Sequence, residues 1–348
     1  MSGNGCAKGF FVFSLLLAVV VCLVSPCRAA TVSSVSGTTS QGNTITISGS
    51  SFGAGPSGVV FDDFELGTDG EDIMTGSGSA RVGQWDSTSG TVYYTDDHVR
   101  SGSLAFEADH ASGWLNYVRR NFPAGTDEVY VVYWVYCPTV FPGESTQDGL
   151  NWKHIWICGN GTTDDDIFLV FQGSDSSANY YLGGNCGTDT YYTGWNRGGE
   201  VDSGDWFRGA YYVEGGLTSG YFEWDLLHDD NTSDSFSNTQ QTWGNSSYLP
   251  YEYRSVRFNG YGRTTQSCYP IHDDCYSAYG SNCRARVEIG NASTYSSCTD
   301  IAIQGPTSWS SSSITAKCNT GGLSSNDSWY LFVIDGSGTA STGEKVKD

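Results

Sequence analysis

The feature that most constrains the fold is the spacing of apolar residues after residue 30, which does not follow the helical pattern i, i+3, i+4, i+7. Short runs instead alternate between apolar and polar residues, separated by clusters of Gly, Ser, Asn and Asp. In Thr44–Ser48, Ile45 and Ile47 share one face, and Gly49 and Gly53 bracket the following turn. Such runs are typical of a sandwich or barrel, so we predict an all-β fold.

The balance of charges narrows the class of partner. The chain has 17 Lys and Arg against 38 Asp and Glu, a formal net charge of −21. This excludes a nucleic-acid partner, because binding to a phosphate backbone depends on Lys and Arg. A strongly acidic protein is soluble and suits cations or neutral sugars as ligands.

Residues 1–29 have the features of a cleaved signal peptide. Lys8 precedes an apolar stretch from Phe10 to Val24, Pro26 ends that stretch, and small residues precede a cut after Ala29. The stretch is shorter than the ~20 residues of a spanning helix, and no later one reaches that length. We therefore expect a protein without a stable membrane span, secreted or at the cell surface, with a retained anchor as the alternative.

The cysteines fit an oxidising destination. Eleven are present, and those outside the leader form an even set, which in an exported chain predicts disulfides. The sequence does not determine the pairing. Local spacing favours Cys158–Cys186, Cys275–Cys283 and Cys298–Cys318.

Both ends of the exported chain resemble parts of one small domain. Residues 42–53 read Gly-Asn-Thr-Ile-Thr-Ile-Ser-Gly-Ser-Ser-Phe-Gly, which resembles the G-x-T-(V/I)-T-I-x-G-x-x-F-G opening of the IPT/TIG immunoglobulin-like fold. Its later strands then lie after residue 284. The resemblance implies an Ig-like sandwich split into residues 30–58 and 285–348, with another domain inserted at 59–284.

The inserted segment resembles the concanavalin A-like lectin/glucanase jelly roll, a group that includes LamG-like and polysaccharide-lyase-like domains. It begins Val59-Val-Phe-Asp-Asp-Phe-Glu65 and ends near Ile271-His-Asp-Asp-Cys-Tyr276. The resemblance implies that these first and last strands are neighbours. Other runs have strand length: Val129–Tyr136, Trp152–Ile157, Ile167–Phe171, Trp206–Val213, Tyr221–Leu227 and Tyr253–Phe258.

In such a jelly roll one curved sheet forms a groove for a glycan, which needs aromatic rings beside polar groups. Strict alternation puts Trp152, His154 and Trp156 on one face of their strand. Tyr221, Glu223 and Asp225 share a face of another strand. The predicted ligand-binding set is completed by Arg257: Trp152, His154, Trp156, Tyr221, Glu223 and Arg257. The alternative is that the rings fill the core between the sheets.

Two enzymatic alternatives remain open, with Glu223, Asp225 and His154 as candidate catalytic residues. Glu223 and Asp225 suit a retaining glycosidase. The glucanase branch carries an E-x-D-x-E strand, but Leu227 stands here at the position of the third acid. A polysaccharide lyase needs a base and a cation, for which the strands offer further candidates: Tyr211, Arg208, Arg254 and Arg257. The R-x-E-x-R, Q-x-H and Y-F-K-x-G-x-Y motifs of alginate-lyase jelly rolls are absent.

Pairs of Asp residues recur, and carboxylate oxygens suit Ca²⁺. The resemblance implies a structural calcium near the terminal strands of the jelly roll, with Asp63 and Asp273 as candidate ligands. The alternative is that these pairs occupy turns and strand ends. The sequence as a whole predicts an exported polysaccharide-binding protein, with a polysaccharide lyase, a glycoside hydrolase or a non-catalytic structural or adhesive subunit as alternatives.

Overall fold

The computed structural model describes residues 29–110, 115–136, 150–159, 166–173, 178–186, 189–201, 204–215, 221–228, 233–238, 252–263 and 270–347. Side chains are not described for 150–152, 166–201, 234, 236–238 and 260–263. The described residues form antiparallel strands and one short 3₁₀ turn, η1 (Tyr295–Ser297). The predicted all-β class is therefore confirmed. In this part of the chain no helix has the length and apolar character needed to cross a membrane.

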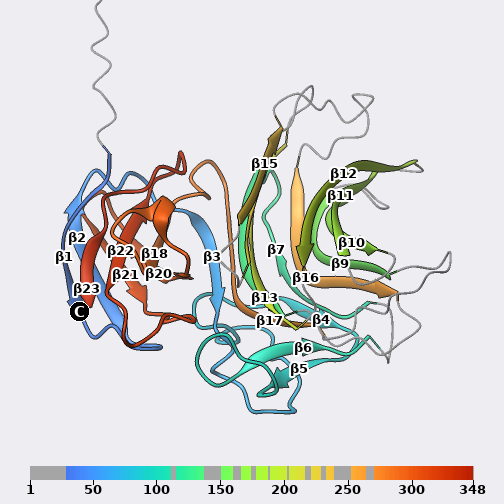
Figure 1. Cartoon of the computed structure of the whole chain (residues 1–348), viewed down its shortest axis with the longest axis horizontal. Coiled ribbons are helices and arrows are strands. Elements are labelled where there is room, and N and C mark those ends of the chain that lie inside the picture. The colour runs from blue at the N-terminus through green and yellow to red at the C-terminus, as the bar shows by residue number, and fades with distance from the viewer. Residues whose placement is uncertain are drawn as a thin grey trace, which may run out of the picture.

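Strands from both ends of the described chain build a small sandwich (Figure 1). One sheet has the order β1-β2-β21-β20 and the other β19-β18-β22-β23. Their bounds are β1 (Thr31–Gly37), β2 (Thr44–Ser50), β18 (Arg286–Gly290), β19 (Ile301–Ile303), β20 (Gly305–Trp309), β21 (Ser313–Lys317), β22 (Trp329–Ile334) and β23 (Glu344–Lys347).

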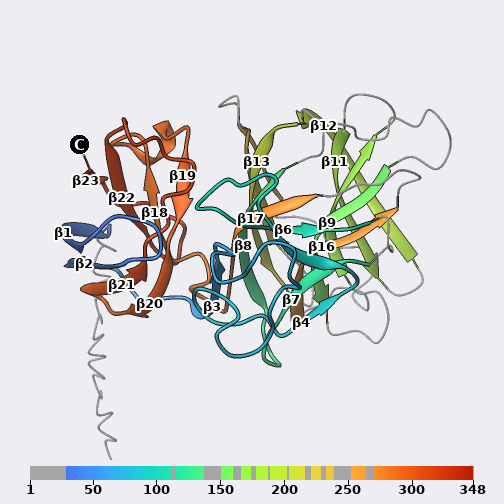
Figure 2. The same ribbon diagram turned by 90° about the horizontal axis from the view of Figure 1, so that it is seen from below.

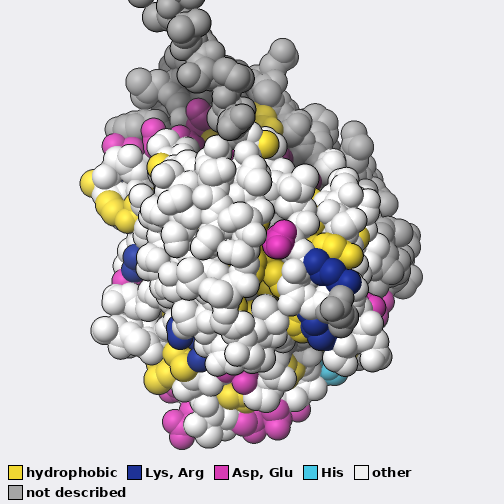
Figure 3. All heavy atoms as spheres, turned by 90° about the vertical axis from the view of Figure 1, so that its left-hand side faces the viewer, with side chains coloured by type: hydrophobic (Ala, Val, Ile, Leu, Met, Phe, Trp, Pro, Cys, Tyr) yellow, Lys and Arg dark blue, Asp and Glu magenta, His cyan; other side chains and the backbone are white. Residues whose placement is uncertain are grey.

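The alternation in β2 explains why this sandwich closes. Ile45 and Ile47 are fully buried in its core, while Thr44 points to solvent and pairs across the sheet with Lys317 of β21. Figure 3 looks onto this sandwich, whose surface is mostly uncharged polar side chains and backbone, with a group of Lys and Arg at one place. The assignment of this sandwich to the IPT/TIG family stays a prediction.

Two larger sheets make up the rest of the fold. The first has seven strands in the order β12-β11-β10-β9-β16-β7-β4. The second has eight, in the order β15-β14-β13-β8-β17-β6-β5 with β3 paired to β17.

The seven-stranded sheet comprises β4 (Ser87–Ser89), β7 (Tyr117–Asn121), β9 (Leu150–Gly159), β10 (Asp166–Gly173), β11 (Ala178–Cys186), β12 (Asp189–Val201) and β16 (Tyr253–Arg263). The eight-stranded sheet comprises β3 (Ser57–Asp62), β5 (Val92–Thr95), β6 (Ala105–Ala108), β8 (Glu128–Tyr136), β13 (Trp206–Glu214), β14 (Tyr221–His228), β15 (Ser233–Asn238) and β17 (Ile271–Tyr279). The expected pairing of the first and last strands is confirmed, since β3 and β17 are neighbours.

The main core lies between the two large sheets. Along β8, Val129, Val131 and Val135 point into this core. The alternate residues Tyr130 and Val132 form a second cluster with Ile303 of the small sandwich. The eight-stranded sheet is therefore the middle layer, and the outer face of the seven-stranded sheet is turned away from the small sandwich (Figure 2).

Buried ions join the middle layer to the small sandwich. Glu288 of β18 is fully buried and forms ion pairs with Arg208 of β13 and with Arg286. The two guanidinium groups hold the pKa of Glu288 below its usual value despite its burial. Because the charges compensate one another only when the layers are in contact, this cluster fixes their relative position.

The predicted disulfides Cys275–Cys283 and Cys298–Cys318 are not formed, and all four residues are buried free cysteines. The reason is their placement in separate cores. Cys275 faces the core between the large sheets, whereas Cys283 packs in the cluster beside Ile303. Cys298 and Cys318 likewise belong to two different clusters of the small sandwich. The proposed partner of Cys158, Cys186, has its side chain outside the described residues.

Candidate functional site

The outer face of the seven-stranded sheet carries aromatic and cationic side chains on three adjacent strands. In β7, Val118 points into the core, so its neighbours Tyr117 and Arg119 point outward. In β16, Val256 and Phe258 are in the core and Arg257 between them points outward. In β9, Ile155 and Ile157 are in the core, and Trp156 points to the opposite face, where it is 8% exposed.

A β-bulge in β9 changes the alternation predicted for this strand. The partner strand β10 pairs Leu169 with Ile155 and then Val170 with Lys153, so that His154 is skipped. The extra residue reverses the facing of the residues before it. Lys153 accordingly lies on the side of Trp156, with Nζ 5.1 Å from the centre of its ring.

The prediction that His154 shares a face with Trp152 and Trp156 is therefore wrong for His154. Its side chain is fully buried between the sheets, where a ring nitrogen is hydrogen-bonded to Oη of Tyr133 at 2.6 Å. Burial holds the pKa of His154 well below its usual value, so the ring is neutral and is not available as a base on the outer face. The side chain of Trp152 lies outside the described residues.

Two arginines meet on this face. Arg257 pairs directly across the sheet with Arg119 of β7 on one side and with Trp156 of β9 on the other. Its guanidinium carbon lies 4.9 Å from the ring centre of Trp156 and 4.8 Å from that of Tyr117. Like charges directly opposite each other destabilise a sheet, so this arrangement is costly unless an anion binds there.

No carboxylate in the described part of the chain forms an ion pair with Arg119 or Arg257, and Nε of each is buried without an acceptor there. The neighbouring arginines differ in having a carboxylate partner, since Arg120 pairs with Asp86 at 3.1 Å and Arg254 pairs with Glu252 at 3.2 Å, although Nε of Arg120 is also buried without an acceptor. We call the five outward residues the cationic row: Tyr117, Arg119, Lys153, Trp156 and Arg257. Indole and phenol rings pack on the C–H faces of sugars, and guanidinium groups bind carboxylates.

The other predicted ligand-binding residues lie on a different sheet. Tyr221 and Glu223 point outward from β14 of the eight-stranded sheet, toward the small sandwich. Glu223 accepts a hydrogen bond from Tyr221 at 2.8 Å and pairs with Arg284 at 2.8 Å. Partial burial, followed by the charge of Glu223, raises the pKa of the neighbouring Asp225. The structure thus brings Trp156 and Arg257 together but separates them from Glu223 and Asp225.

Sequence reasoning missed Tyr117 and Arg119. The alternation Tyr-Val-Arg over residues 117–119 was a usable signal for a strand with two polar outward residues. Their pairing with Arg257 depends on the register between β7 and β16, which no local pattern contains.

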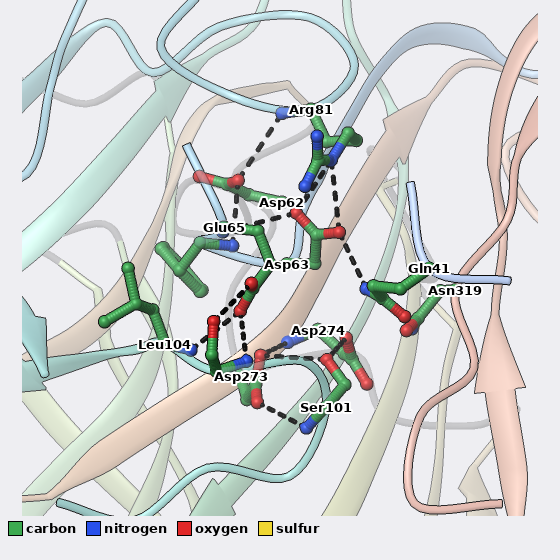
Figure 4. A network of polar contacts seen from close by, with 12 residues as sticks. Gln41, Asp62, Asp63, Glu65, Arg81, Ser101, Leu104, Asp273, Asp274 and Asn319 are labelled. Carbon is green, nitrogen blue, oxygen red and sulfur yellow. Dashed lines mark hydrogen bonds and ion pairs between the residues drawn. The ribbon is translucent and has the colours of Figure 1, made fainter. Parts of the chain in front are cut away.

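The candidate calcium ligands belong to a buried group of carboxyl groups where β3 and β17 meet (Figure 4). Asp63 faces Nε of Arg81 through both oxygens, at 3.0 and 3.1 Å, and accepts a hydrogen bond from Gln41 at 2.8 Å. Asp273 accepts hydrogen bonds from the backbone amides of Arg100 and Ser101, both at 2.9 Å.

These contacts do not fit a calcium ion at Asp63 and Asp273. Calcium takes about six to eight oxygen ligands, whereas the oxygens of both carboxylates already accept hydrogen bonds from protein groups. Among the described residues, no group of three or more His, Cys, Asp and Glu has the arrangement of a metal site. A calcium ion stays a prediction from the sequence, but Asp63 and Asp273 as arranged here do not form its site.

Burial also changes the acidity of this group. Asp62, which accepts a hydrogen bond from Nε1 of Trp85 at 2.7 Å, has its pKa raised by burial to about 7. Burial raises the pKa of Asp274 to about 7 as well, and raises that of Asp273, which also faces the charge of Asp274. The junction between the sandwiches therefore holds carboxyl groups that are weaker acids than usual.

Comparison with solved structures finds distant resemblances over about half of the chain. A peanut lectin bound to a peptide has 10% identity, covers 54% of this chain and 92% of its own, and gives a TM-score of 0.34. An alginate lyase from Klebsiella pneumoniae has 10% identity, covers 54% of this chain and 84% of its own, and gives a TM-score of 0.37. The catalytic domain of a GH131 β-glucanase from Podospora anserina has 12% identity, covers 64% of this chain and 96% of its own, and gives a TM-score of 0.36.

These TM-scores are too low for any of the three proteins to indicate an activity for this chain. A scan against protein-family models found no match, and a search of the curated proteins found none. The function is therefore inferred from the residues of the site.

Proposed function

We propose that this protein binds an acidic polysaccharide along the outer face of the seven-stranded sheet. The observation that carries the proposal is the direct pairing of Arg119 with Arg257, neither of which has a carboxylate partner in the described residues. The guanidinium of Arg257 also lies beside the rings of Trp156 and Tyr117. A uronate ring offers both chemistries that this surface needs, a carboxylate for the guanidinium groups and C–H faces for the aromatic rings.

The net charge of −21 opposes approach of a polyanion only at long range. At physiological ionic strength charges separated by more than about 8 Å are largely screened. Contacts between a sugar carboxylate and Arg257 or Arg119 act well within that distance. Binding is therefore governed by the local cations of the row.

Affinity electrophoresis in gels containing alginate or polygalacturonate tests the proposal, with neutral dextran as the uncharged polymer. Arg257→Gln and Arg119→Gln are expected to abolish retardation in the acidic gels. The matched control is Arg120→Gln, a neighbour in β7 whose guanidinium is already paired with Asp86. Equal retardation in dextran, or unchanged retardation of Arg257→Gln, would contradict the proposal.

The enzymatic alternatives have a separate test. A lyase would release unsaturated uronates from alginate or polygalacturonate, which absorb in the ultraviolet, and a hydrolase would release reducing ends. His154, Glu223 and Asp225 do not lie on the cationic row. If a product is released, its loss in the Tyr117→Phe variant would be the evidence that catalysis takes place at the cationic row. Binding without product supports a binding protein, and no retention on any polymer supports the structural or adhesive alternative.

The proposal includes two expectations from the sequence. Export is checked by fractionating cells that express the full chain and by identifying the mature N-terminus. Structural calcium is checked by thermal unfolding after EDTA treatment, with calcium or magnesium then restored. A rise in Tm with calcium alone would support the ion.

A further inference from the structure

A cavity of about 630 Å³ lies where the small sandwich meets the edge of the large one. It is lined by the start of β3, by the loop that contains Arg81 and Val82, and by β20 with Thr307, Ser308 and Trp309. This volume is in the range of small-molecule sites. None of these residues contributes to the cationic row.

The walls of the cavity are held in place by backbone contacts. Phe61 and Val82 exchange two backbone hydrogen bonds, of 3.0 and 2.9 Å, which fix the loop against β3. On the other wall, the ring of Trp309 lies on Gly55 so closely that a Cβ at Gly55 would come within 2.4 Å of it. The site is therefore formed before any ligand enters, which reduces the entropic cost of binding.

Arg81 presents hydrogen-bond donors at this cavity. Its Nε is used by Asp63, which orients the guanidinium. Arg81 is one of the residues that line the cavity, and its two Nη groups form no hydrogen bond with the described residues. Ser308, whose side chain is exposed, adds a hydroxyl at the rim.

The charge around the cavity selects an uncharged ligand. Asp63 neutralises Arg81 through an ion pair of 3.0 Å, so the cavity offers no unbalanced cation to attract an anionic ligand. A cation would have to approach the guanidinium. Val59, Val82 and two prolines supply the apolar part of a lining that is more polar than apolar, and this part suits the C–H faces of a sugar whose oxygens accept hydrogen bonds.

We infer that this cavity is a second binding site, for one or two rings of a neutral saccharide. Hydroxyl oxygens of the sugar accept hydrogen bonds from the Nη groups of Arg81, and its ring packs against Trp309 and the apolar walls. The site is independent of the cationic row, because it differs from the row in position and in the charge of its ligand.

Saturation-transfer NMR on the full chain, with glucose, galactose, mannose, cellobiose and lactose as probes, tests the inference. At least one probe is expected to receive saturation. Ser308→Trp, which fills the mouth of the cavity, is expected to abolish the signal. Ser34→Trp, at an exposed serine of β1 that does not line the cavity, is expected to leave it unchanged. Arg81→Lys keeps a cation beside Asp63 and is expected to weaken binding about tenfold through loss of the Nη donors.

Saturation of none of the probes, or equal saturation in Ser308→Trp, would overturn the inference. The Arg257→Gln variant separates this site from the proposed function. If neutral sugars still bind to that variant while alginate retardation is lost, the two sites are distinct. If both are lost together, the cavity is not a second site. Thermal unfolding of each variant distinguishes a loss of binding from a loss of fold.

Discussion

Replacing Asp274 by Asn is expected to stabilise the protein at alkaline pH. The side chain is fully buried in β17, Oδ1 accepts a hydrogen bond from Ser101 at 2.7 Å, and the side chain of Asn319 lies beside the carboxyl group. The backbone φ of Asp274 is +50°, a conformation that Asn tolerates as readily as Asp. The amide can keep the bond to Ser101 and removes the buried charge.

The magnitude comes from the pKa of this carboxyl group, which burial raises from 3.8 to about 7. A shift of about three units corresponds to roughly 4 kcal/mol, since each unit is worth about 1.4 kcal/mol. The folded state binds the proton more tightly than the unfolded state does. Stability is therefore fully present below the unfolded value of 3.8 and is lost as the pH rises through about 7.

Urea unfolding followed by Trp fluorescence at several pH values measures this effect. The free energy of unfolding of the parent protein should fall between about pH 4 and pH 8.5, and that of Asp274→Asn should fall by roughly 4 kcal/mol less. An unsatisfied amide hydrogen would lower the stability of the variant by about 1–3 kcal/mol at every pH, so the difference between the two slopes is the decisive quantity.

Asp327→Asn is the matched control, because Asp327 is exposed and its replacement should leave the slope unchanged. If Asp274→Asn and the parent protein lose stability in parallel as the pH rises, the buried charge of Asp274 is not the cause. A change of m-value in the variant would instead mean that the unfolded or folded state had changed its exposed surface.

Two further predictions concern other buried groups. Glu288→Gln leaves Arg208 and Arg286 buried without their counter-charge and should lower the free energy of unfolding by about 3–5 kcal/mol; a loss no larger than that of the exposed Asp327→Asn in the same urea assay would refute the role of the cluster. The thiols of Cys275 and Cys318 should not react with a thiol reagent until denaturant is added, because both are fully buried and burial raises the pKa of Cys318 to about 12. Rapid labelling in the native state, or their recovery in a disulfide-linked peptide, would show that this description is wrong.

The fold class could be predicted because it depends on local spacing. Ile45 and Ile47 alternate with threonines in the sequence, and they are the residues that fill the core of the small sandwich. The pairing of cysteines could not be predicted in this way. Cys275 and Cys283 are near in sequence, yet the turn between them carries the chain from one core to another.

The bulge at His154 shows the same limit within a single strand. The run Trp-Lys-His-Ile-Trp-Ile alternates over residues 152–157, and nothing in it marks where an extra residue would be accommodated. The partner strand β16 also departs from regular pairing opposite this point, between Phe258 and Tyr261, and Asn259 there has a φ of +58°. The direction in which His154 points is thus decided by two strands together.

The ligand proposed for the cationic row differs in charge from the one that the net charge favours. A value of −21 describes the whole surface, and it favoured neutral sugars over uronates. Recognition depends on charges within a few ångströms of the ligand. Whether each arginine has a carboxylate partner therefore matters more than the net charge of the whole protein. Arg120 and Arg254 have acidic partners, whereas Arg119 and Arg257 have none among the described residues. The register of β7, β16 and β9 brings Arg119 opposite Arg257 and Arg257 opposite Trp156, so the ligand class can be proposed only once the sheet is known.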